Sequence, residues 1–192
     1  MIHRLLYRLT AKLPCRLINI DNKPYLERYY LGKLLGVTFY LHRFVSADCE
    51  RHLHNHPWGW GRALVLTGSY TEERVTDICP AVSKSGCLTT FKRVRWWNRV
   101  DGNHFHRISA AELNTWTLFY HGPRVCLPTG VLKGWGFLEN AFTVGYHDTT
   151  VFRTHSSDTS DWWLTSPKGR ESQRIASGLR PRPRKTERHR RN

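Results

Sequence analysis

Histidines recur at alternate positions in two short stretches of the chain. The stretch RHLHNHPWGW carries His52, His54 and His56, and His104 and His106 repeat the same spacing about fifty residues later. Side chains two positions apart on a strand project from one face, about 7 Å from each other. Two such strands facing each other across a β-barrel would bring at least three neutral imidazoles to one metal ion and leave coordination positions open for a substrate.

The alternative is that these histidines are ordinary polar residues at the mouth of a barrel. A single His-x-His pair would favour that interpretation, because clustered imidazoles repel one another when protonated. Two pairs in a chain rich in strands favour the metal site instead. The sequence contains no P-loop, no Rossmann glycine fingerprint and no Ser–His–Asp order, so these other kinds of site are not predicted.

The strands that must position the histidines are short and rich in aromatic and β-branched residues. Turn signals of Gly, Pro and Asp separate them. The predicted strands cover residues 25–31, 37–45, 51–56, 63–70, 91–100, 104–108, 115–120, 124–127, 135–138 and 141–146. This length and spacing indicate an all-β sandwich or barrel rather than alternating β and α units. Gly68 marks a bulge or a close approach of backbone within its strand.

Segments at both ends flank the predicted barrel, which spans residues 23–150. In segment 1–22, five apolar residues share one helical face and predict a short helix docked on the body: Ile2, Leu5, Leu6, Leu9 and Leu13. Residues 151–177 are predicted to form an appendage that Trp162, Trp163 and Leu164 hold against the barrel. Residues 178–192 are nearly free of apolar side chains and predict a disordered basic tail.

The net charge of +15 is unevenly distributed over the 192 residues. From residue 168 onward there are ten Lys or Arg and two Glu, and a flexible cationic tail can neutralise phosphates of a nucleic acid or another polyanion. Within 91–100, Val94, Trp96, Asn98 and Val100 alternate with Arg93, Arg95, Trp97 and Arg99. This pattern predicts a cationic face for nucleic acid, on which Trp97 stacks on bases. A solvated face and a tail that only aids solubility are the alternatives.

Cysteine spacing and hydropathy bear on the compartment. The five cysteines form no Cys-x-x-Cys pair, which argues against a thiolate zinc site and a disulfide framework. They indicate thiols in a reducing cytoplasm. No apolar run of 18 or more residues occurs, so no membrane span is predicted.

The stretch HLHNHPWGWGRALVLTGSYTEE resembles the first motif of the cupin superfamily, in which a paired-His strand is followed by a strand ending in glycine and an acidic residue. More narrowly it resembles the three-histidine thiol dioxygenases of the cysteine dioxygenase type. The second motif of that family is similar to His106-Arg107-Ile108, followed by Tyr120-His121-Gly122-Pro123. The stretch YLERYYLG resembles the strand whose arginine holds the substrate carboxylate. The likeness covers roughly residues 25–140.

The resemblance implies a double-stranded β-helix, or jelly roll, around a bound Fe(II). It implies His54, His56 and His106 as metal ligands, Arg28 as a clamp for the substrate carboxylate, and Tyr120 as an aromatic hydroxyl near the metal. His52 and His104 are then candidates for a fourth ligand or for partners that orient the ligand rings. Zn, Ni and Mn are the alternative ions.

Three departures from the family pattern bear on the substrate. No carboxylate follows the paired histidines in PWGWGR, where general cupins have a glutamate ligand. Gly61 stands near the place of the cysteine that animal cysteine dioxygenases link to their tyrosine. The polar strand Ser-x-His-x-Tyr reads Trp116-x-Leu118-x-Tyr120, which predicts a more apolar pocket.

The function predicted from the sequence is that of a cytoplasmic mononuclear non-haem Fe(II) oxygenase, a dioxygenase in the resemblance, which uses O₂ and a small substrate that Arg28 could bind as an anion. One alternative is a non-redox cupin isomerase or lyase, with His104 or His106 as a base. The other is a nucleic-acid-associated cupin that binds or modifies nucleotides through its basic surface and tail. The sequence leaves the substrate, the metal and the oligomeric state open.

Overall fold

The computed structural model describes residues 2–20, 22–46, 52–78, 87–139, 149–153 and 161–172. Its helices are α1 (Ile2–Leu9) and the 3₁₀ turns η1 (Thr10–Lys12) and η2 (Trp162–Leu164). Its strands are β1 (Cys15–Ile20), β2 (Lys23–Leu34), β3 (Val37–Phe44), β4 (Trp60–Thr67), β5 (Tyr70–Ile78), β6 (Cys87–Val94), β7 (Trp97–Asp101), β8 (His106–Ala111), β9 (Trp116–His121), β10 (Trp135–Glu139) and β11 (Thr149–Arg153). The predicted strand at 141–146 and the basic tail at 178–192 lie outside the described residues.

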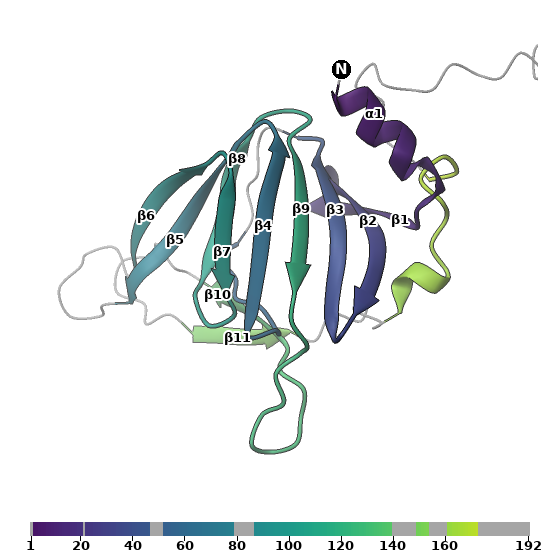
Figure 1. Ribbon diagram of the computed structural model, residues 1–192. Helices are drawn as coiled ribbons and strands as arrows, with labels where there is room; N and C mark the ends of the chain where they lie inside the picture. Colours follow the sequence, from purple (N-terminus) through teal and green to yellow (C-terminus); the bar gives the residue numbers. More distant parts are fainter. Residues whose placement is uncertain are drawn as a thin grey trace, which may run out of the picture.

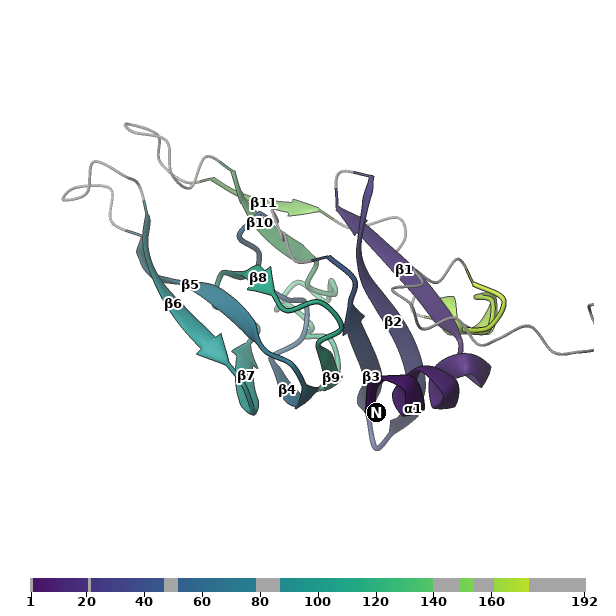
Figure 2. The same ribbon diagram turned by 90° about the horizontal axis from the view of Figure 1, so that it is seen from above.

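The strands form two layers of antiparallel sheet (Figures 1 and 2). One sheet has the order β1-β2-β3-β9-β4-β7, and the other contains β6-β5-β8. The segment 52–56 is too irregular to count as a strand, but His54 bridges both His106 at the start of β8 and Phe137 in β10. It therefore extends the second sheet, which β10 and β11 complete.

Eight of these segments have the order of a jelly roll. The row β3-β9-β4-β7 faces the row formed by segment 52–56, β8, β5 and β6, which is the double Greek-key arrangement that cupins share. The all-β cupin fold with a short N-terminal helix, predicted from the sequence, is confirmed.

The main core lies between the two sheets. It joins Phe44 and Val65 of the larger sheet to Tyr70, Val94 and Ala111 of the smaller one. Residues alternate along each strand, so that in β4 the inward side chains are buried and the intervening ones are half-buried. Burial of these large side chains from both layers supplies the hydrophobic free energy that holds the sheets together.

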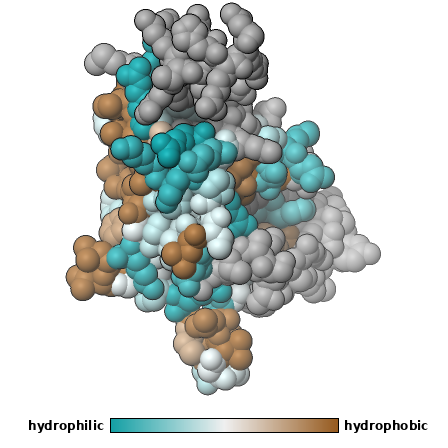
Figure 3. All heavy atoms as spheres, turned by 90° about the vertical axis from the view of Figure 1, so that its right-hand side faces the viewer, coloured by the Kyte–Doolittle hydropathy of each residue, from teal (hydrophilic) through white to brown (hydrophobic). Residues whose placement is uncertain are grey.

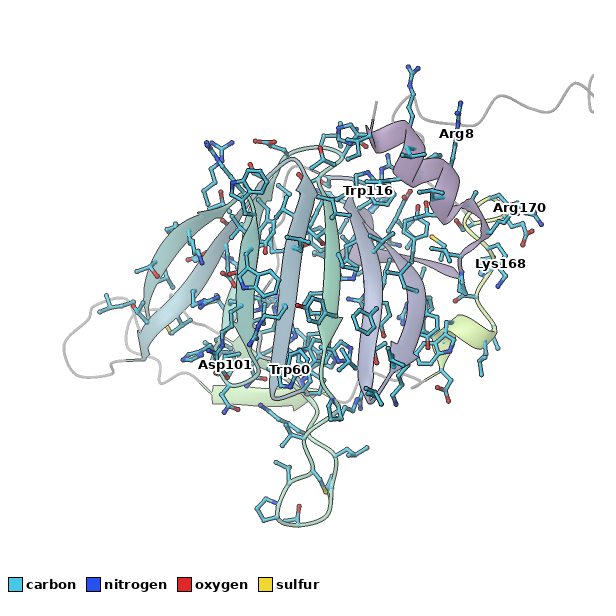
Figure 4. The ribbon with its side chains drawn as sticks, in the orientation of Figure 1. Arg8, Trp60, Asp101, Trp116, Lys168 and Arg170 are labelled. Atoms are coloured by element: carbon cyan, nitrogen blue, oxygen red, sulfur yellow. The ribbon has the colours of Figure 1, made fainter. Side chains whose placement is uncertain are left out.

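The outer face of the larger sheet carries α1 at its upper end, where Figure 4 shows Trp116 beside the helix. Tyr7 covers a fully buried ion pair between Arg43 and Glu27, whose atoms are 2.9 Å apart, and its ring lies 5.0 Å from the Arg43 guanidinium. Nearby, Tyr29 and Trp116 stack with their ring centroids 5.8 Å apart. The helix therefore covers a polar pair as well as apolar rings.

The apolar helical face predicted to dock does so only in part: Leu6 and Leu13 pack against the buried cluster that contains Tyr7 and Trp116. His3, Leu6, Tyr7 and Thr10 face the sheet, spaced as one side of a helix, because this side provides the aromatic ring over Arg43. The other apolar residues remain exposed, with Ile2 at 47%, Leu5 at 55% and Leu9 at 61%. The helix also ends before Leu13, and residues 15–20 form β1 against β2.

Two long predicted strands are each divided between the two sheets. The strand predicted at 63–70 breaks at Gly68, whose φ is +79° and where a Cβ would lie 2.3 Å from the Thr115 Oγ1 atom. The close approach predicted at Gly68 is confirmed. The strand predicted at 91–100 breaks between Val94 and Trp97, which begins β7 in the opposite sheet, so Trp96 at the turn is 78% exposed rather than inward-facing.

Two connecting segments also differ from expectation. Residues 124–127 form isolated bridges rather than a strand. Segment 122–134, which includes the exposed Val131, protrudes at the lower end of the molecule, where Figure 3 shows apolar side chains (Figures 1 and 3). Trp163 stacks on Tyr30 at 4.1 Å, and Trp162 is buried, whereas Leu164 is exposed.

No helix within the described parts of the chain is long and apolar enough to cross a membrane.

Candidate metal centre

Three of the five predicted histidines converge inside the jelly roll. His54, His56 and His106 are buried, and one ring nitrogen of each lies within 4.8 Å of the others. The His56 and His106 Nε2 atoms are 2.7 Å apart. The main chains of His54 and His106 donate to each other's carbonyls at 3.0 and 2.9 Å, which fixes two of the three rings relative to each other.

Hydrogen bonds on the far side of two rings determine which nitrogen carries a proton. The His54 Nδ1 atom lies 3.0 Å from the His52 carbonyl oxygen, which can only accept. The His106 Nδ1 atom lies 2.5 Å from a carboxylate oxygen of Glu72. Both acceptors require a proton on Nδ1, so in the neutral rings the Nε2 lone pairs remain for a metal ion.

Glu72 is the residue that orients His106. It is 1% exposed on β5, and its second oxygen accepts from Arg74 Nη2 and Asn98 Nδ2, each at 2.9 Å. Burial raises the pKa of Glu72, but the hydrogen bond and charge of His106, the charge of Arg74 and the Asn98 bond outweigh burial and lower this pKa to about 2. The carboxylate is therefore ionised whenever the protein is near neutral pH.

Glu72 lies at the end of the stretch that resembles the first cupin motif, but no role was predicted for it. The available signal was its position two residues after Tyr70 on the same strand, which gives both side chains the same inward direction. His42 was missed in the same way, since it shares the inward face of β3 with Tyr40 and Phe44.

The histidines end a small cavity with mainly aromatic walls. His56 stacks on Trp58 with centroids 4.6 Å apart, and the Trp135 ring lies 4.8 Å from His56. The cavity volume is about 80 Å³, far below the roughly 300–1,000 Å³ of sites for drug-sized ligands. Its lining also includes Phe119, Ala63, Val100, Ile108, Thr117, Tyr70 and Asn98.

Arg28 lines the same cavity as the three histidines. Its Nε donates to the Nε2 atom of His42 at 3.0 Å, and its guanidinium lies 5.3 Å from the centre of the Tyr40 ring. Since His42 accepts at Nε2, that nitrogen carries no proton. The ring of His42 also stacks on Phe119 at 5.2 Å. The position predicted for a substrate clamp is therefore on the cavity wall.

Tyr120 does not lie near the histidines, and its predicted role beside the metal is wrong. Its neighbour Phe119 faces the cavity, so alternation along β9 directs Tyr120 to the outer face of the sheet. There its ring stacks on Phe39 at 5.5 Å and lies 6.2 Å from the rings of Trp60 and Trp97.

The two remaining histidines lie outside the cluster. The side chain of His52 is exposed, and this residue contributes its carbonyl to His54 instead. His104 has a 61% exposed side chain, 3.8 Å from Asp101. Neither ring is placed to be a fourth ligand, although the main chain of His52 does orient a ligand ring.

The donor set fits a metal ion on the chemistry of its atoms. Nitrogens that share one ion at about 2.0–2.1 Å lie about 3–4 Å apart. The three nitrogens here, with one pair 2.7 Å apart and all within 4.8 Å, are close to that spacing. Hydrogen bonds at Nδ1 leave the Nε2 lone pairs of two neutral rings available, and the surroundings are buried and aromatic. Imidazole ligands suit Fe, Zn, Cu and Ni.

No family model and no curated protein matches this chain. Among solved structures it is similar to Streptomyces albus HEPD with 2-hydroxyethylphosphonate and Fe(II) bound, at 12% identity and a TM-score of 0.45 over 61% of this chain and 25% of that chain. It is also similar to Fe(II) HppE, at 14% identity and a TM-score of 0.42 over 58% and 56% of the two chains. A third similar structure is oxalate decarboxylase from Bacillus subtilis, at 15% identity and a TM-score of 0.43 over 63% and 30%.

The chain thus spans between a quarter and just over half of the length of these proteins. Likenesses this distant assign no activity, and the fold assignment rests on the strand order itself. The narrower resemblance to the cysteine dioxygenase type stays a prediction.

Proposed function

We propose that this chain is a mononuclear non-haem iron oxygenase that acts on a small acid. The observation that carries the proposal is the buried cluster of His54, His56 and His106, with two ring tautomers fixed, at the end of a cavity that also contains Arg28. Fe(II) bound by three neutral imidazoles would supply the redox chemistry with O₂ and keep open positions for the substrate.

Arg28 has the role of binding the acidic group of the substrate. A guanidinium can grip a carboxylate or phosphonate with two parallel hydrogen bonds. The bond from its Nε to His42, and the stacking of His42 on Phe119, hold the guanidinium in one orientation. Such positioning reduces the entropy lost when the substrate is ordered for reaction.

The cavity walls restrict the substrate and exclude water. Trp58, Trp135 and Phe119 leave about 80 Å³, which admits a molecule of only a few heavy atoms. Glu72 and the His52 carbonyl hold the Nδ1 protons of two ligand rings away from the cavity, so in the neutral rings the Nε2 lone pairs are left for the ion.

The non-redox alternative has less support because its predicted bases are badly placed. His106 belongs to the cluster itself, and His104 is mostly exposed outside the cavity. A general base must come within about 3 Å of the proton that it removes, so His104 would need a large rearrangement.

Metal content and oxygen uptake test the proposal. Protein purified without an affinity tag and supplied anaerobically with Fe(II) should hold about one ion per chain, as should the His104→Ala control, whereas His56→Ala should lose it. An oxygen electrode should detect uptake when small carboxylic or phosphonic acids are added to the wild type and the control, and none with His56→Ala. Retention of zinc with turnover in the absence of oxygen would favour the isomerase or lyase instead.

A further inference from the structure

The outer face of the larger sheet carries a row of aromatic rings, of which Trp97 is exposed and Phe39, Trp60 and Tyr120 are half-buried. Tyr120 of β9 is at the centre, stacked on Phe39 of β3 at 5.5 Å and 6.2 Å from both Trp60 of β4 and Trp97 of β7. Trp97 is 48% exposed. Figure 4 shows Trp60 near the lower end of this sheet, whereas α1 and Trp116 lie at its upper end.

Two arginines lie among these rings. Arg62 pairs in register with Tyr120 on one side and with Arg99 on the other. The Arg62 guanidinium also lies 5.5 Å from the centre of the Trp60 ring. Like charges directly opposite on neighbouring strands are destabilising, so the Arg62–Arg99 pair favours an anion bound between the two strands.

Little negative charge on this face competes for that anion. Asp101, at the edge of the sheet, is the one acidic residue among the described side chains that face outward from β3, β4, β7 and β9 below α1. One oxygen of Asp101 accepts from the Asn103 amide at 3.0 Å, and the other lies 3.8 Å from His104. The whole chain carries a net charge of +15, which attracts a polyanion at long range.

We propose that this face, defined by Phe39, Trp60, Arg62, Trp97, Arg99 and Tyr120, binds single-stranded nucleic acid. Bases stack on Trp97 and Tyr120, and phosphates lie against Arg62 and Arg99. Rings with accessible faces beside cations are what unpaired bases on a charged backbone require, and a duplex, whose bases are already stacked, cannot use the rings. This function is separate from the metal centre, because the face lies on the opposite side of the sheet from the cavity.

The surface differs from the one expected from the sequence. Of the four residues predicted for nucleic-acid contact, Trp97 and Arg99 belong to this face. Arg93 and Arg95 line a separate groove instead, where Arg93 donates to Glu112 at 2.6 Å and to Ser69 at 3.1 Å. The break between β6 and β7 separates these two pairs.

Fluorescence anisotropy of a labelled oligothymidylate of about 12 nucleotides tests the proposal on the full-length chain, so that the basic tail contributes equally to every variant. Trp97→Ala should weaken binding about 5- to 100-fold with little change in salt dependence. The double variant Arg62→Gln, Arg99→Gln should weaken it at least about tenfold and lower the slope of log affinity against log salt by about 1.4.

Two matched controls should bind as the wild type does. Phe91→Ala removes a ring that is 64% exposed on β6, and Arg170→Gln removes an exposed cation that Figure 4 shows beside the end of α1, away from Trp60 and Asp101. The proposal is wrong if Trp97→Ala binds as tightly as the wild type, since the tail or charge alone would then explain binding. It is equally wrong if duplex DNA binds as tightly as the single strand, or if the protein binds no oligonucleotide at low salt. Near-ultraviolet circular dichroism checks that each variant is folded.

Discussion

The substitution Glu72→Gln gives the sharpest test of the metal centre. One oxygen of Glu72 accepts a hydrogen bond from Nδ1 of His106, and the other oxygen accepts from Arg74 and Asn98. A glutamine keeps the shape but loses the charge, and its NH₂ group would face donors on one side. The substitution therefore weakens the hold on His106 without removing a metal ligand.

The size of the effect follows from the contacts of Glu72. Its pKa is lowered from 4.5 to about 2, which corresponds to roughly 3 kcal/mol of preference for the ionised form. Because one partner of a buried charged network is lost, we expect a destabilisation of about 2–4 kcal/mol. Loss of a carboxylate behind a ligand histidine typically lowers metal affinity about 10- to 100-fold.

The matched control is the next residue on the same strand. Glu73 is also buried, but it faces the other side of β5, where it accepts from Arg107 at 2.6 Å and Thr89 at 2.9 Å. Glu73→Gln should lower the free energy of unfolding comparably and leave metal affinity unchanged. Urea denaturation gives the first quantity, and anaerobic titration of metal against a competing chelator gives the second.

The pair of variants separates positioning of His106 from general stability. If Glu72→Gln binds metal as tightly as the wild type while His106→Ala does not, then Glu72 does not orient the ligand. If both glutamine variants lose metal affinity equally, the loss reflects destabilisation, and the assigned role of Glu72 is wrong.

Three other outcomes are expected. Arg28→Lys should weaken the binding of a small acid at least about tenfold, because an ammonium replaces a planar fork; a KM unchanged within twofold for every acid that is turned over would contradict the clamp. Gly68→Ala should cost about 2 kcal/mol or more in urea unfolding, since alanine meets both the positive φ and Thr115; a variant as stable as the wild type would refute the close approach. The pKa of Glu72 is lowered in the folded protein, so the contribution of Glu72 to the free energy of unfolding is complete above pH 4.5 and is lost as pH falls toward 2. The free energy of unfolding of the metal-free protein should fall by roughly 3 kcal/mol over this range. An equally steep fall in Glu72→Gln would show that other groups cause it.

The histidine cluster could be predicted from the sequence because spacing marked two groups of paired histidines, and the resemblance to the cupin motifs then implied which three of them would be ligands. His54 and His56 share a face by alternation, and His106 reaches them once the jelly roll brings its segment alongside. Alternation also placed Asn98 and Val100 inward. Residues 91–100 were predicted as one strand and instead belong to two strands, β6 and β7. The inward direction of Asn98 and Val100 was still predicted correctly, because the alternation of side chains continues across the turn between these strands.

The wrong predictions concern which face of an element a side chain occupies, and a shift of one residue is enough to change that face. Phe119 and Tyr120 are adjacent aromatics, and a shift of one residue exchanges the cavity face for the outer face. In α1, hydrophobicity favoured the side with Ile2 and Leu5, but the buried Arg43 beneath the helix selected the side with Tyr7. Neither choice is visible without the partner strand or the ion pair.

The reciprocal main-chain bonds between His54 and His106 have a consequence for exchange of the ion. Folding alone sets these two ligands side by side, so the entropic cost of ordering them is met before any ion arrives. Loading and release should then proceed without opening of the sheet. The amide protons of both residues should exchange with solvent as slowly in the apoprotein as in the metal-loaded form. The hydrogen bonds that protect these protons join main-chain groups and do not involve the ion.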